Sequence, residues 1–237
     1  MSPGRSHVRN CRRSVFSESE MPKAEGGDAV RGTDEGAMTY SLLRFGHLIG
    51  LVLIGAGLIG VFVSDLRSRQ VRDLRLFAEA IRHVGLFYDG LVVPGAILLL
   101  LTGAWLTWMV WGGWNFLNIP WLAGMIGLFA FEFVEGNTVT RLYFMRVRRL
   151  TKVSLEQGGV TPELERARHQ HLPTFTHFLD IPILLVIVSL GALRPDTWSQ
   201  FAVGTGLAVV TATLLTVTLP RLYPWVPPVL ASQRKAI

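Results

Sequence analysis

The residues of this sequence that are suited to chemistry are ionisable side chains at the ends of long apolar segments. His177 and Asp180 open the segment HFLDIPILLVIVSLGAL, residues 177–193, which carries no further charge. Charged groups are costly inside a membrane, so ionisable residues at that depth are functional candidates by default. A histidine and an aspartate three residues apart share one face of a helix. The pair therefore predicts a polar site at the entrance to a membrane-spanning helix.

Other ionisable residues lie at the corresponding ends of the other apolar segments. Successive crossings of a membrane would bring all of them to one side, where we expect a single polar layer with Tyr88 nearby. Its acidic members are Asp65, Asp89, Glu132, Glu135 and Asp180, and its histidines, His83 and His177, are expected to pair with each other. The alternative is that each residue caps a helix, reaches the lipid headgroups or pairs with an arginine such as Arg141.

His47 stands apart from this layer, near the opposite end of the first apolar segment. Gly46 and Gly50 lie beside it four residues apart, which is a spacing of small residues that permits close approach of another helix or of a flat cofactor. An axial haem ligand needs an imidazole in such a setting. The alternative is a buried histidine that bonds to a neighbouring backbone carbonyl.

The elements that position these residues are long apolar helices. Half of the 237 residues are hydrophobic, and the mean hydropathy is +0.38. A hydrocarbon core of ~30 Å requires about 20 apolar residues in a helix. Five segments fit this length, namely residues 42–63, 90–110, 116–134, 175–193 and 201–219. The sequence therefore predicts an all-α, polytopic transmembrane bundle of about five spans over residues 38–225.

The distribution of lysine and arginine predicts how the bundle is oriented. Residues 64–85 contain five of these side chains and residues 137–174 contain seven, whereas residues 111–118 contain none. Basic loops remain in the cytoplasm, so we expect the N-terminus outside, the C-terminus inside and residues 226–237 as a short cytoplasmic tail. Residues 67–83 combine apolar and charged side chains at helical spacing, which predicts an amphipathic helix lying along the cytoplasmic surface.

The N-terminal residues 1–37 have a different composition. They contain six basic and six acidic residues and no apolar segment. This composition is typical of a disordered leader, or it indicates a mis-assigned gene start with Met38 as the first residue. Cys11, the single cysteine, excludes a disulfide framework. The sequence pI of about 10.1 reflects the basic loops and favours contact with anionic lipids, not with nucleic acid.

Three segments resemble a known family. LLRFGHLIG, YDGLVVPGAILLLLTGAWL and FLDIPILLVIVSLGALRP look like the predicted integral membrane proteins of a bacterial family of unknown function, over residues 40–195. That family in turn resembles the copper-resistance D type and the membrane protoporphyrinogen-oxidase type of small helical bundle. The resemblance implies a location in the bacterial cytoplasmic (inner) membrane. It also implies haem b as a cofactor, with His47 as the ligand from the first span.

Three functions remain after the soluble enzyme classes are excluded. The sequence contains no P-loop, dinucleotide fingerprint, zinc-protease motif or serine nucleophile elbow. The first function is a redox-linked protein that binds haem or a metal through His47, or through His83 and His177. The second is a small transporter or proton-linked permease that uses the acidic layer. The third is a non-catalytic subunit or assembly factor that contacts other membrane subunits as well as the lipid bilayer.

Overall fold

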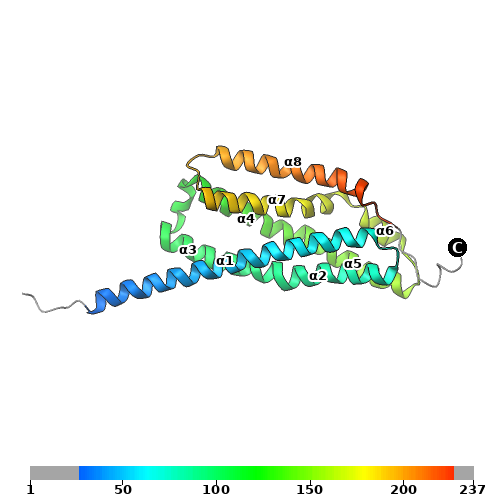
Figure 1. Ribbon diagram of the computed structural model, residues 1–237, viewed down its shortest axis with the longest axis horizontal. Helices are drawn as coiled ribbons and strands as arrows, with labels where there is room; N and C mark the ends of the chain where they lie inside the picture. The colour runs from blue at the N-terminus through cyan, green and yellow to red at the C-terminus, as the bar shows by residue number, and fades with distance from the viewer. Residues whose placement is uncertain (1–26, 227–237) are drawn as a thin grey trace, which may run out of the picture. The chain divides into compact units, whose positions relative to one another are not determined.

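The computed structural model consists mainly of long helices that lie side by side (Figure 1). It describes residues 27–226, with side chains from residue 36 onward. The chain divides after Thr39, and the bundle belongs to the unit that begins at Tyr40. The α-helices are α1 (Gly27–Gln70), α2 (Leu74–Phe87), α3 (Val93–Trp111), α4 (Pro120–Glu135), α5 (Arg141–Glu156), α6 (Pro162–Arg168), α7 (His171–Leu193) and α8 (Ser199–Leu222). No strand occurs in the described part of the chain.

Two breaks in helical geometry interrupt otherwise continuous rods. The π-helix η1 (Tyr88–Val92) joins α2 to α3, and the π-helix η3 (Gly136–Thr140) joins α4 to α5. A short 3-10 helix, η2 (Gly113–Asn118), turns the chain between α3 and α4. The π-helix is rare and occurs often at functional sites, so both segments bear on the site described below.

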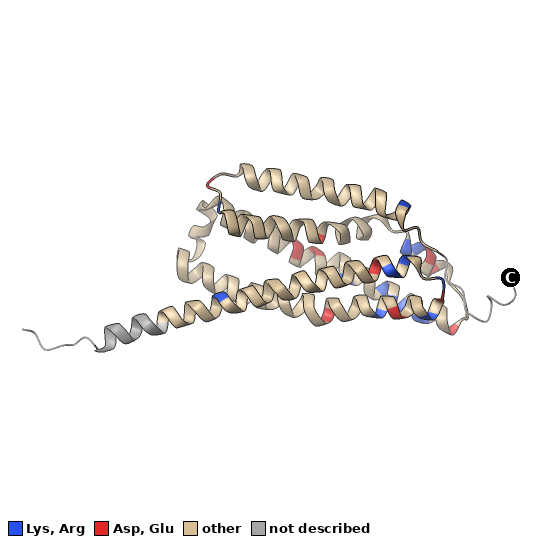
Figure 2. Ribbon diagram, in the orientation of Figure 1, with Lys and Arg blue, Asp and Glu red and all other residues tan. Residues whose placement is uncertain are grey.

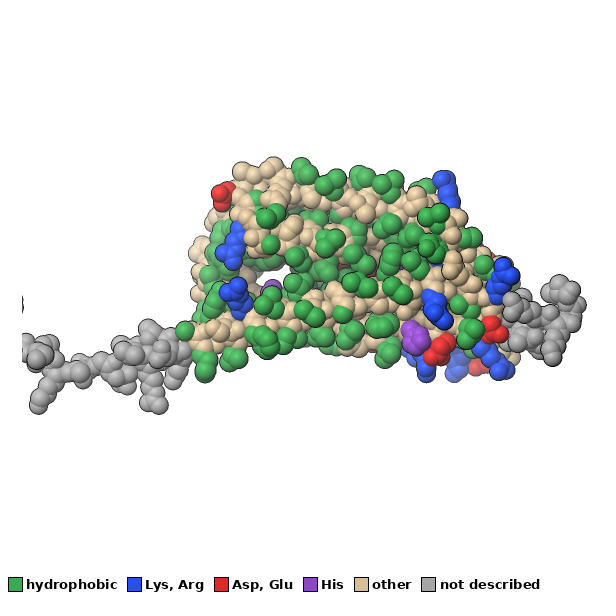
Figure 3. Space-filling model, in the orientation of Figure 1, with side chains coloured by type: hydrophobic (Ala, Val, Ile, Leu, Met, Phe, Trp, Pro, Cys, Tyr) green, Lys and Arg blue, Asp and Glu red, His purple; other side chains and the backbone are tan. Residues whose placement is uncertain are grey.

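Five of the described helical rods are long and apolar enough to cross a membrane. They are Gly36–Gln70, Leu74–Trp111, Pro120–Glu156, His171–Leu193 and Ser199–Leu222. Large apolar side chains such as Val52, Leu101, Leu185 and Leu207 are more than three-fifths exposed, and Figure 3 shows apolar side chains spread along the helices. The prediction of an all-α bundle with five spans is confirmed, and the exposed apolar surface fits contact with lipid.

Three of the rods, with 35 to 38 residues each, are much longer than a bilayer core. Leu74–Trp111 contains 38 residues, which corresponds to roughly 57 Å of helix against a core of ~30 Å. Its excess length, together with α5 and α6, forms an end of the bundle where most of the charged side chains gather (Figure 2). We call this region the charged end.

The helix α2 packs inside the charged end. Its residues Leu74, Phe77 and Val84 are fully buried and belong to one hydrophobic cluster with Val147 of α5 and Leu164 of α6. The prediction that residues 67–83 lie along the membrane surface is therefore wrong. The apolar face of this amphipathic segment is covered by other helices of the same chain.

Glycines allow α1 to lie directly against α2, η1 and α3. A Cβ atom on Gly50 would meet the Gly95 carbonyl oxygen at 3.0 Å, and one on Gly57 would meet Val92 Cγ2 at 2.6 Å. A Cβ on Gly60 would likewise meet the Phe87 ring at 2.6 Å. The backbone of α1 therefore approaches its neighbours as closely as small residues permit.

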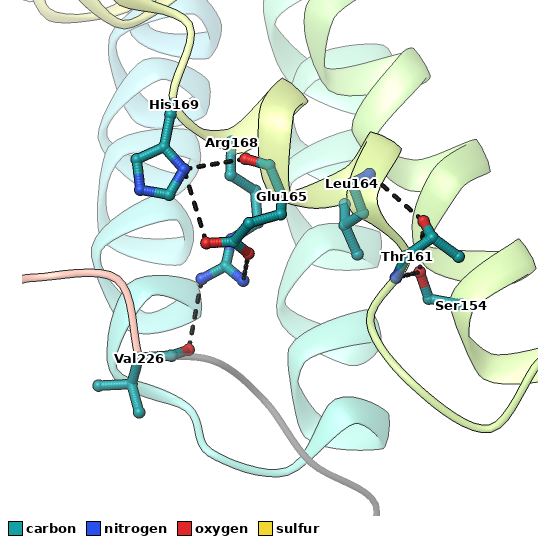
Figure 4. A network of polar contacts seen from close by, with 7 residues as sticks. All are labelled: Ser154, Thr161, Leu164, Glu165, Arg168, His169 and Val226. Carbon is teal, nitrogen blue, oxygen red and sulfur yellow. Dashed lines mark hydrogen bonds and ion pairs between the residues drawn. The ribbon is translucent and has the colours of Figure 1, made fainter.

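The short helix α6 is held by a cap and a polar contact. The Thr161 hydroxyl accepts from the Leu164 backbone N–H at 3.3 Å, Pro162 occupies the first helical position, and the Ser154 hydroxyl accepts from the Thr161 backbone N–H at 3.2 Å (Figure 4). A threonine cap followed by proline is a favoured start for a helix. The cap orients α6 so that Arg168 points into the charged end.

Arg168 is fully buried beside the segment that follows α8. Its guanidinium donates to the Val226 carbonyl and to Glu165, both at 3.3 Å (Figure 4). It also lies 4.3 Å from the centre of the Trp225 ring. Burial lowers the pKa of this guanidinium, and the charge of Glu165 opposes the shift. Cation–π contact and hydrogen bonds thus hold the chain after α8 against the charged end.

The predicted ends of the chain are only partly covered by the described residues. The helix α1 begins at Gly27, and the assignment of residues 1–37 as a disordered leader or a mis-assigned start stays a prediction. Residues 1–26 lie outside the described part, as do residues 227–237 of the predicted tail.

Candidate functional site

Three carboxylates meet where α4 packs against α7. Glu132 and Glu135 are three residues apart on α4 and so share one face of that helix, and Asp180 projects from α7. Each offers one oxygen, and the three oxygens lie within 4.8 Å of one another. Glu135 and Asp180 are buried, and Glu132 is half-buried. We call these three residues the acidic triad.

The acidic triad lies within two rods that are long and apolar enough to cross a membrane. Counting from Pro120 at the start of α4, and from Leu193 at the end of α7, the triad is 12 to 15 residues away. The helical rise of ~1.5 Å per residue makes this distance about 20 Å. A hydrocarbon core is ~30 Å thick, so a core that begins at Pro120 and Leu193 would enclose the acidic triad.

Three of the six carboxylate oxygens of the acidic triad have no hydrogen-bond partner among the described residues. Glu132 Oε1, Glu135 Oε2 and Asp180 Oδ1 are buried and unpaired with any described residue. The other oxygen of Glu135 accepts a 2.8 Å bond from the hydroxyl of Thr140, which lies 3.1 Å from the Thr176 hydroxyl. Unpaired carboxylate oxygens are costly in a low dielectric, so this cluster is suited to binding a cation or protons.

His177 lies beside the acidic triad on the same helix as Asp180. Its Nδ1 is 3.8 Å from Asp180 Oδ2, its side chain is 4% exposed, and neither ring nitrogen has a hydrogen-bond partner among the described residues. The ring packs edge-on against Phe144 at a centroid distance of 5.2 Å and is tilted against Phe178 at 5.3 Å. Aromatic packing therefore fixes the imidazole next to the acidic triad without satisfying its polar atoms.

The two π-helical segments hold the surroundings of the acidic triad. The Tyr88 hydroxyl of η1 donates a 2.7 Å bond to the carbonyl of Gly136 in η3. A second link joins Arg141 Nη2 to Asp89 Oδ1 at 3.0 Å. Thr140 follows Glu135 by five residues. The wider π turn, with its repeat of five residues, brings the Thr140 hydroxyl within reach of the Glu135 carboxylate.

A small cavity opens onto the acidic triad. It has a volume of about 60 Å³ and is lined by Glu132 and Asp180 together with Tyr88, Asn137 and apolar side chains of α1, η1 and α7. A space of this size holds a few water molecules or a partly hydrated ion. The carboxylates thus face a space that can receive what they bind.

The predicted polar layer is divided into separate groups. Asp65 forms a buried ion pair with Arg69 at 2.9 Å, and Asp89 pairs with Arg141 at the surface. His83 is exposed on α2 and lies 3.6 Å from Glu79. The predicted pairing of His83 with His177 is therefore wrong, because the two rings contact different residues.

The alternative of pairing with arginine applies to Asp65 and Asp89 but not to Glu132 and Glu135. Arg141 contacts Asp89, and no arginine within the described range contacts Glu132 or Glu135. The rotation of each helix decides this division, because residues at similar depth project toward different neighbours.

His47 is half-buried on α1 near the opposite end of the bundle. Its Nδ1 lies 3.1 Å from the Thr102 hydroxyl, which itself donates to the Leu98 carbonyl at 2.6 Å. The close approach predicted for Gly46 and Gly50 is made by a helix, since Thr102 and Leu99 of α3 lie against these two glycines. The role of His47 as a haem ligand stays a prediction.

Several residues of the site were not found by sequence reasoning. Thr140, which bonds to Glu135, and Thr176, which contacts Thr140, gave no signal beyond ordinary helical threonines. Arg69 and Arg168 were counted only as basic residues of loops, although both are buried with their guanidinium groups over the Trp225 ring, at 4.7 and 4.3 Å. Apolar residues at helical spacing around an arginine are the signal that favours such burial.

Comparison with known proteins supports the membrane assignment. Residues 41–195 match a family model described as a predicted integral membrane protein. The search of curated proteins and that of solved structures both returned no match, so no likeness to the copper-resistance D or protoporphyrinogen-oxidase types was found. The matched segment covers four of the five spanning rods in whole or in part, together with the acidic triad. The chain belongs to the DUF2269 family of predicted integral membrane proteins.

Proposed function

We propose that this protein is a small transporter of the bacterial cytoplasmic membrane, of the kind predicted as a proton-linked permease, and that its acidic triad binds the transported or coupling cation. The observation that carries the proposal is the meeting of Glu132, Glu135 and Asp180 within 4.8 Å between two candidate membrane spans. Ionisable residues within spans that face the bundle interior mark ion and substrate pathways.

The electrostatics of the acidic triad support cation binding over a purely structural role. Asp65 and Arg69 are an example of a structural ion pair in this bundle, because each charge has a partner of opposite sign at 2.9 Å. The acidic triad has no basic partner among the described residues except His177, whose Nδ1 stays 3.8 Å from Asp180. Like charges this close in a low dielectric repel strongly, and a bound cation relieves the repulsion.

The local architecture supports movement at the site. The π-helical segments η1 and η3 lie in two candidate spans beside the acidic triad, and π-helical turns occur often at functional sites. The cavity gives the carboxylates an adjoining space. A binding site, a cavity and interrupted helices are the parts that a small transporter requires.

The experiment measures charge movement by the full-length protein reconstituted in liposomes on a solid-supported membrane. Addition of the low-molecular-mass fraction of a bacterial extract is expected to produce a transient current with the wild-type protein. The Glu132→Gln variant should reduce the current to the level of protein-free liposomes. Glu163→Gln is the matched control, because it changes an exposed glutamate paired with Arg166 on α6. Equal currents from the wild type and protein-free liposomes would overturn the proposal, as would a full current from Glu132→Gln.

A further inference from the structure

We propose that the cation bound by the acidic triad is a divalent metal ion of the Mn²⁺ class, held by Glu132, Glu135 and Asp180 with His177 as a further ligand. This inference rests on the transporter function proposed above and names the chemical class of its cargo. It is carried by the arrangement of the donor atoms and by the unpaired imidazole beside them.

The spacing of the oxygen atoms fits a single ion. Oxygen ligands lie 2.0–2.6 Å from Mg²⁺ or Ca²⁺, so two oxygens on opposite sides of one ion are separated by about 4 to 5 Å. The three carboxylate oxygens lie within 4.8 Å of one another. Only small side-chain movements are needed to bring all three into contact with the same ion.

Three buried carboxylate oxygens of the acidic triad have no hydrogen-bond donor beside them in the described part of the chain, so they are free to bind a metal ion. Glu132 Oε1, Glu135 Oε2 and Asp180 Oδ1 accept no hydrogen bond from any residue between 36 and 226. The second oxygen of Glu135 is held by Thr140, and Thr140 contacts Thr176. Ligating carboxylates are commonly oriented by such outer hydrogen bonds.

His177 provides the independent observation that points to a metal ion. The residue is 3% exposed, and both of its ring nitrogens lack a hydrogen-bond partner within the described chain. Its Nδ1 lies 3.8 Å from Asp180 Oδ2, at the edge of the acidic triad. His177 lies outside the group of donor atoms within 4.8 Å of one another, so its side chain must move toward the acidic triad to bind the same ion. A buried imidazole without a hydrogen-bond partner gains a bond by doing so.

The donor set selects the class of metal. Carboxylates and water suit Mg²⁺, Ca²⁺ and Mn²⁺, whereas imidazole suits transition metals. Three carboxylates with one imidazole therefore favour Mn²⁺ over Mg²⁺ and Ca²⁺. The absence of cysteine from residues 12–237 leaves no thiolate to favour a softer ion at this site. The cavity of about 60 Å³ has room for the water molecules that complete the coordination.

The first experiment measures Mn²⁺ binding to the metal-stripped, detergent-purified full chain by electron paramagnetic resonance. The wild type is expected to remove the sharp signal of the free aqua ion with one site per chain. Asp180→Asn should weaken binding by at least about tenfold, because loss of an outer-shell partner alone costs 10–100-fold in affinity. Asp196→Asn is the matched control, since this aspartate is exposed in the loop between α7 and α8. Excess Mg²⁺ should not displace the bound Mn²⁺.

A second variant keeps the test valid if Asp180→Asn does not fold. Thr140→Val retains every ligand and removes the contacts of its hydroxyl with Glu135 Oε1 and Thr176. It should lower Mn²⁺ affinity several-fold, while the metal-free variant still unfolds cooperatively, at a temperature somewhat below that of the wild type. Absence of Mn²⁺ binding by the wild type would overturn the inference. Unchanged affinity in both variants would do the same.

The current measurement separates this inference from the proposed function. Mn²⁺ alone should reproduce the current seen with the extract, and extract treated with a chelator should give none. If chelated extract still drives a current that Glu132→Gln abolishes, the transporter function stands and the metal inference fails. If neither extract nor Mn²⁺ drives a current, the function itself fails, whatever the binding experiment gives.

Discussion

The phenolic hydroxyl of Tyr88 lies 2.7 Å from the backbone carbonyl oxygen of Gly136 and joins the two π-helical segments beside the acidic triad. A Cβ atom on Gly136 would stand 2.7 Å from the same hydroxyl. The contact therefore requires both a tyrosine on η1 and a glycine on η3. This hydrogen bond joins two spans next to the acidic triad without involving any of the three carboxylates.

Loss of this hydroxyl should destabilise the bundle modestly. Tyr88→Phe removes one hydrogen bond, and the Gly136 carbonyl keeps its bond from the Arg141 backbone N–H. We expect the free energy of unfolding in detergent to fall by about 1 kcal/mol. Gly136→Ala should cost more in the wild type than in Tyr88→Phe, because the phenyl ring leaves room for the added methyl group. Additive effects of these two substitutions in a double-mutant cycle would contradict the contact.

Neutralising substitutions within the acidic triad should be coupled. In the metal-free protein, Glu132→Gln relieves repulsion with Asp180, so the single variant should be at least as stable as the wild type. Asp180→Asn then relieves less repulsion in the Glu132→Gln background than in the wild type. The coupling free energy between the two substitutions should be about 0.5–3 kcal/mol. The cycle that combines Glu132→Gln with the distant Glu163→Gln should be additive within about 0.5 kcal/mol. Additivity in the first cycle would show that the two carboxylates do not interact.

Two neighbouring glycines of α1 should respond oppositely to alanine. Gly57→Ala places a Cβ 2.6 Å from Val92 Cγ2, whereas the nearest atom to a Cβ on Gly55 is Leu184 Cδ2 at 4.0 Å. Overpacking typically costs about 1–3 kcal/mol, and alanine in an open helical position gains about 0.5–1 kcal/mol over glycine. The thermal unfolding temperature in detergent should therefore be lower for Gly57→Ala, and higher for Gly55→Ala, than for the wild type. Equal shifts for the two variants would contradict the close approach of α1 to η1.

The buried ion pair between Asp65 and Arg69 should contribute far more to the free energy of unfolding than an exposed ion pair does. Both side chains are 3% exposed, and Arg69 also stacks over the Trp225 ring at 4.7 Å. Asp65→Asn leaves a buried guanidinium without its charge partner, which costs about 3–5 kcal/mol. The exposed pair Glu163 with Arg166 provides the comparison, because Glu163→Gln should cost less than about 1 kcal/mol. A chemical unfolding series that ranks the two variants equally would count against burial of the first pair.

The orientation of the bundle stays a prediction from the basic loops. Reporter fusions after Leu117, in the connection between α3 and α4, should report the periplasm. Fusions after Gln157, between α5 and α6, should report the cytoplasm. Both expectations follow from the retention of basic loops on the cytoplasmic side. The reverse result at both sites would show that the charged end faces outward.

The sequence by itself determined the spans and the start of α6. A hydrophobic stretch must bury its backbone hydrogen bonds within itself in lipid, so hydropathy alone predicts five helices, and these are confirmed. Thr161 followed by Pro162 likewise predicts the start of a helix from local chemistry. Such features depend on residues close together in the chain and on the solvent around them.

Only the tertiary structure decided which polar residues meet. Asp89, Glu132 and Asp180 stand at similar positions in their spans, yet Asp89 turns outward to Arg141 while the other two face each other. The rotation of each helix about its axis sets these partners, and it depends on the glycine contacts of α1 and on the π-helical turns at Tyr88–Val92 and Gly136–Thr140. One additional residue in a helical turn rotates every later side chain by about 100°, because an α-helix has 3.6 residues per turn. Hydropathy is insensitive to such a rotation, so the acidic triad emerges only when the helices are packed.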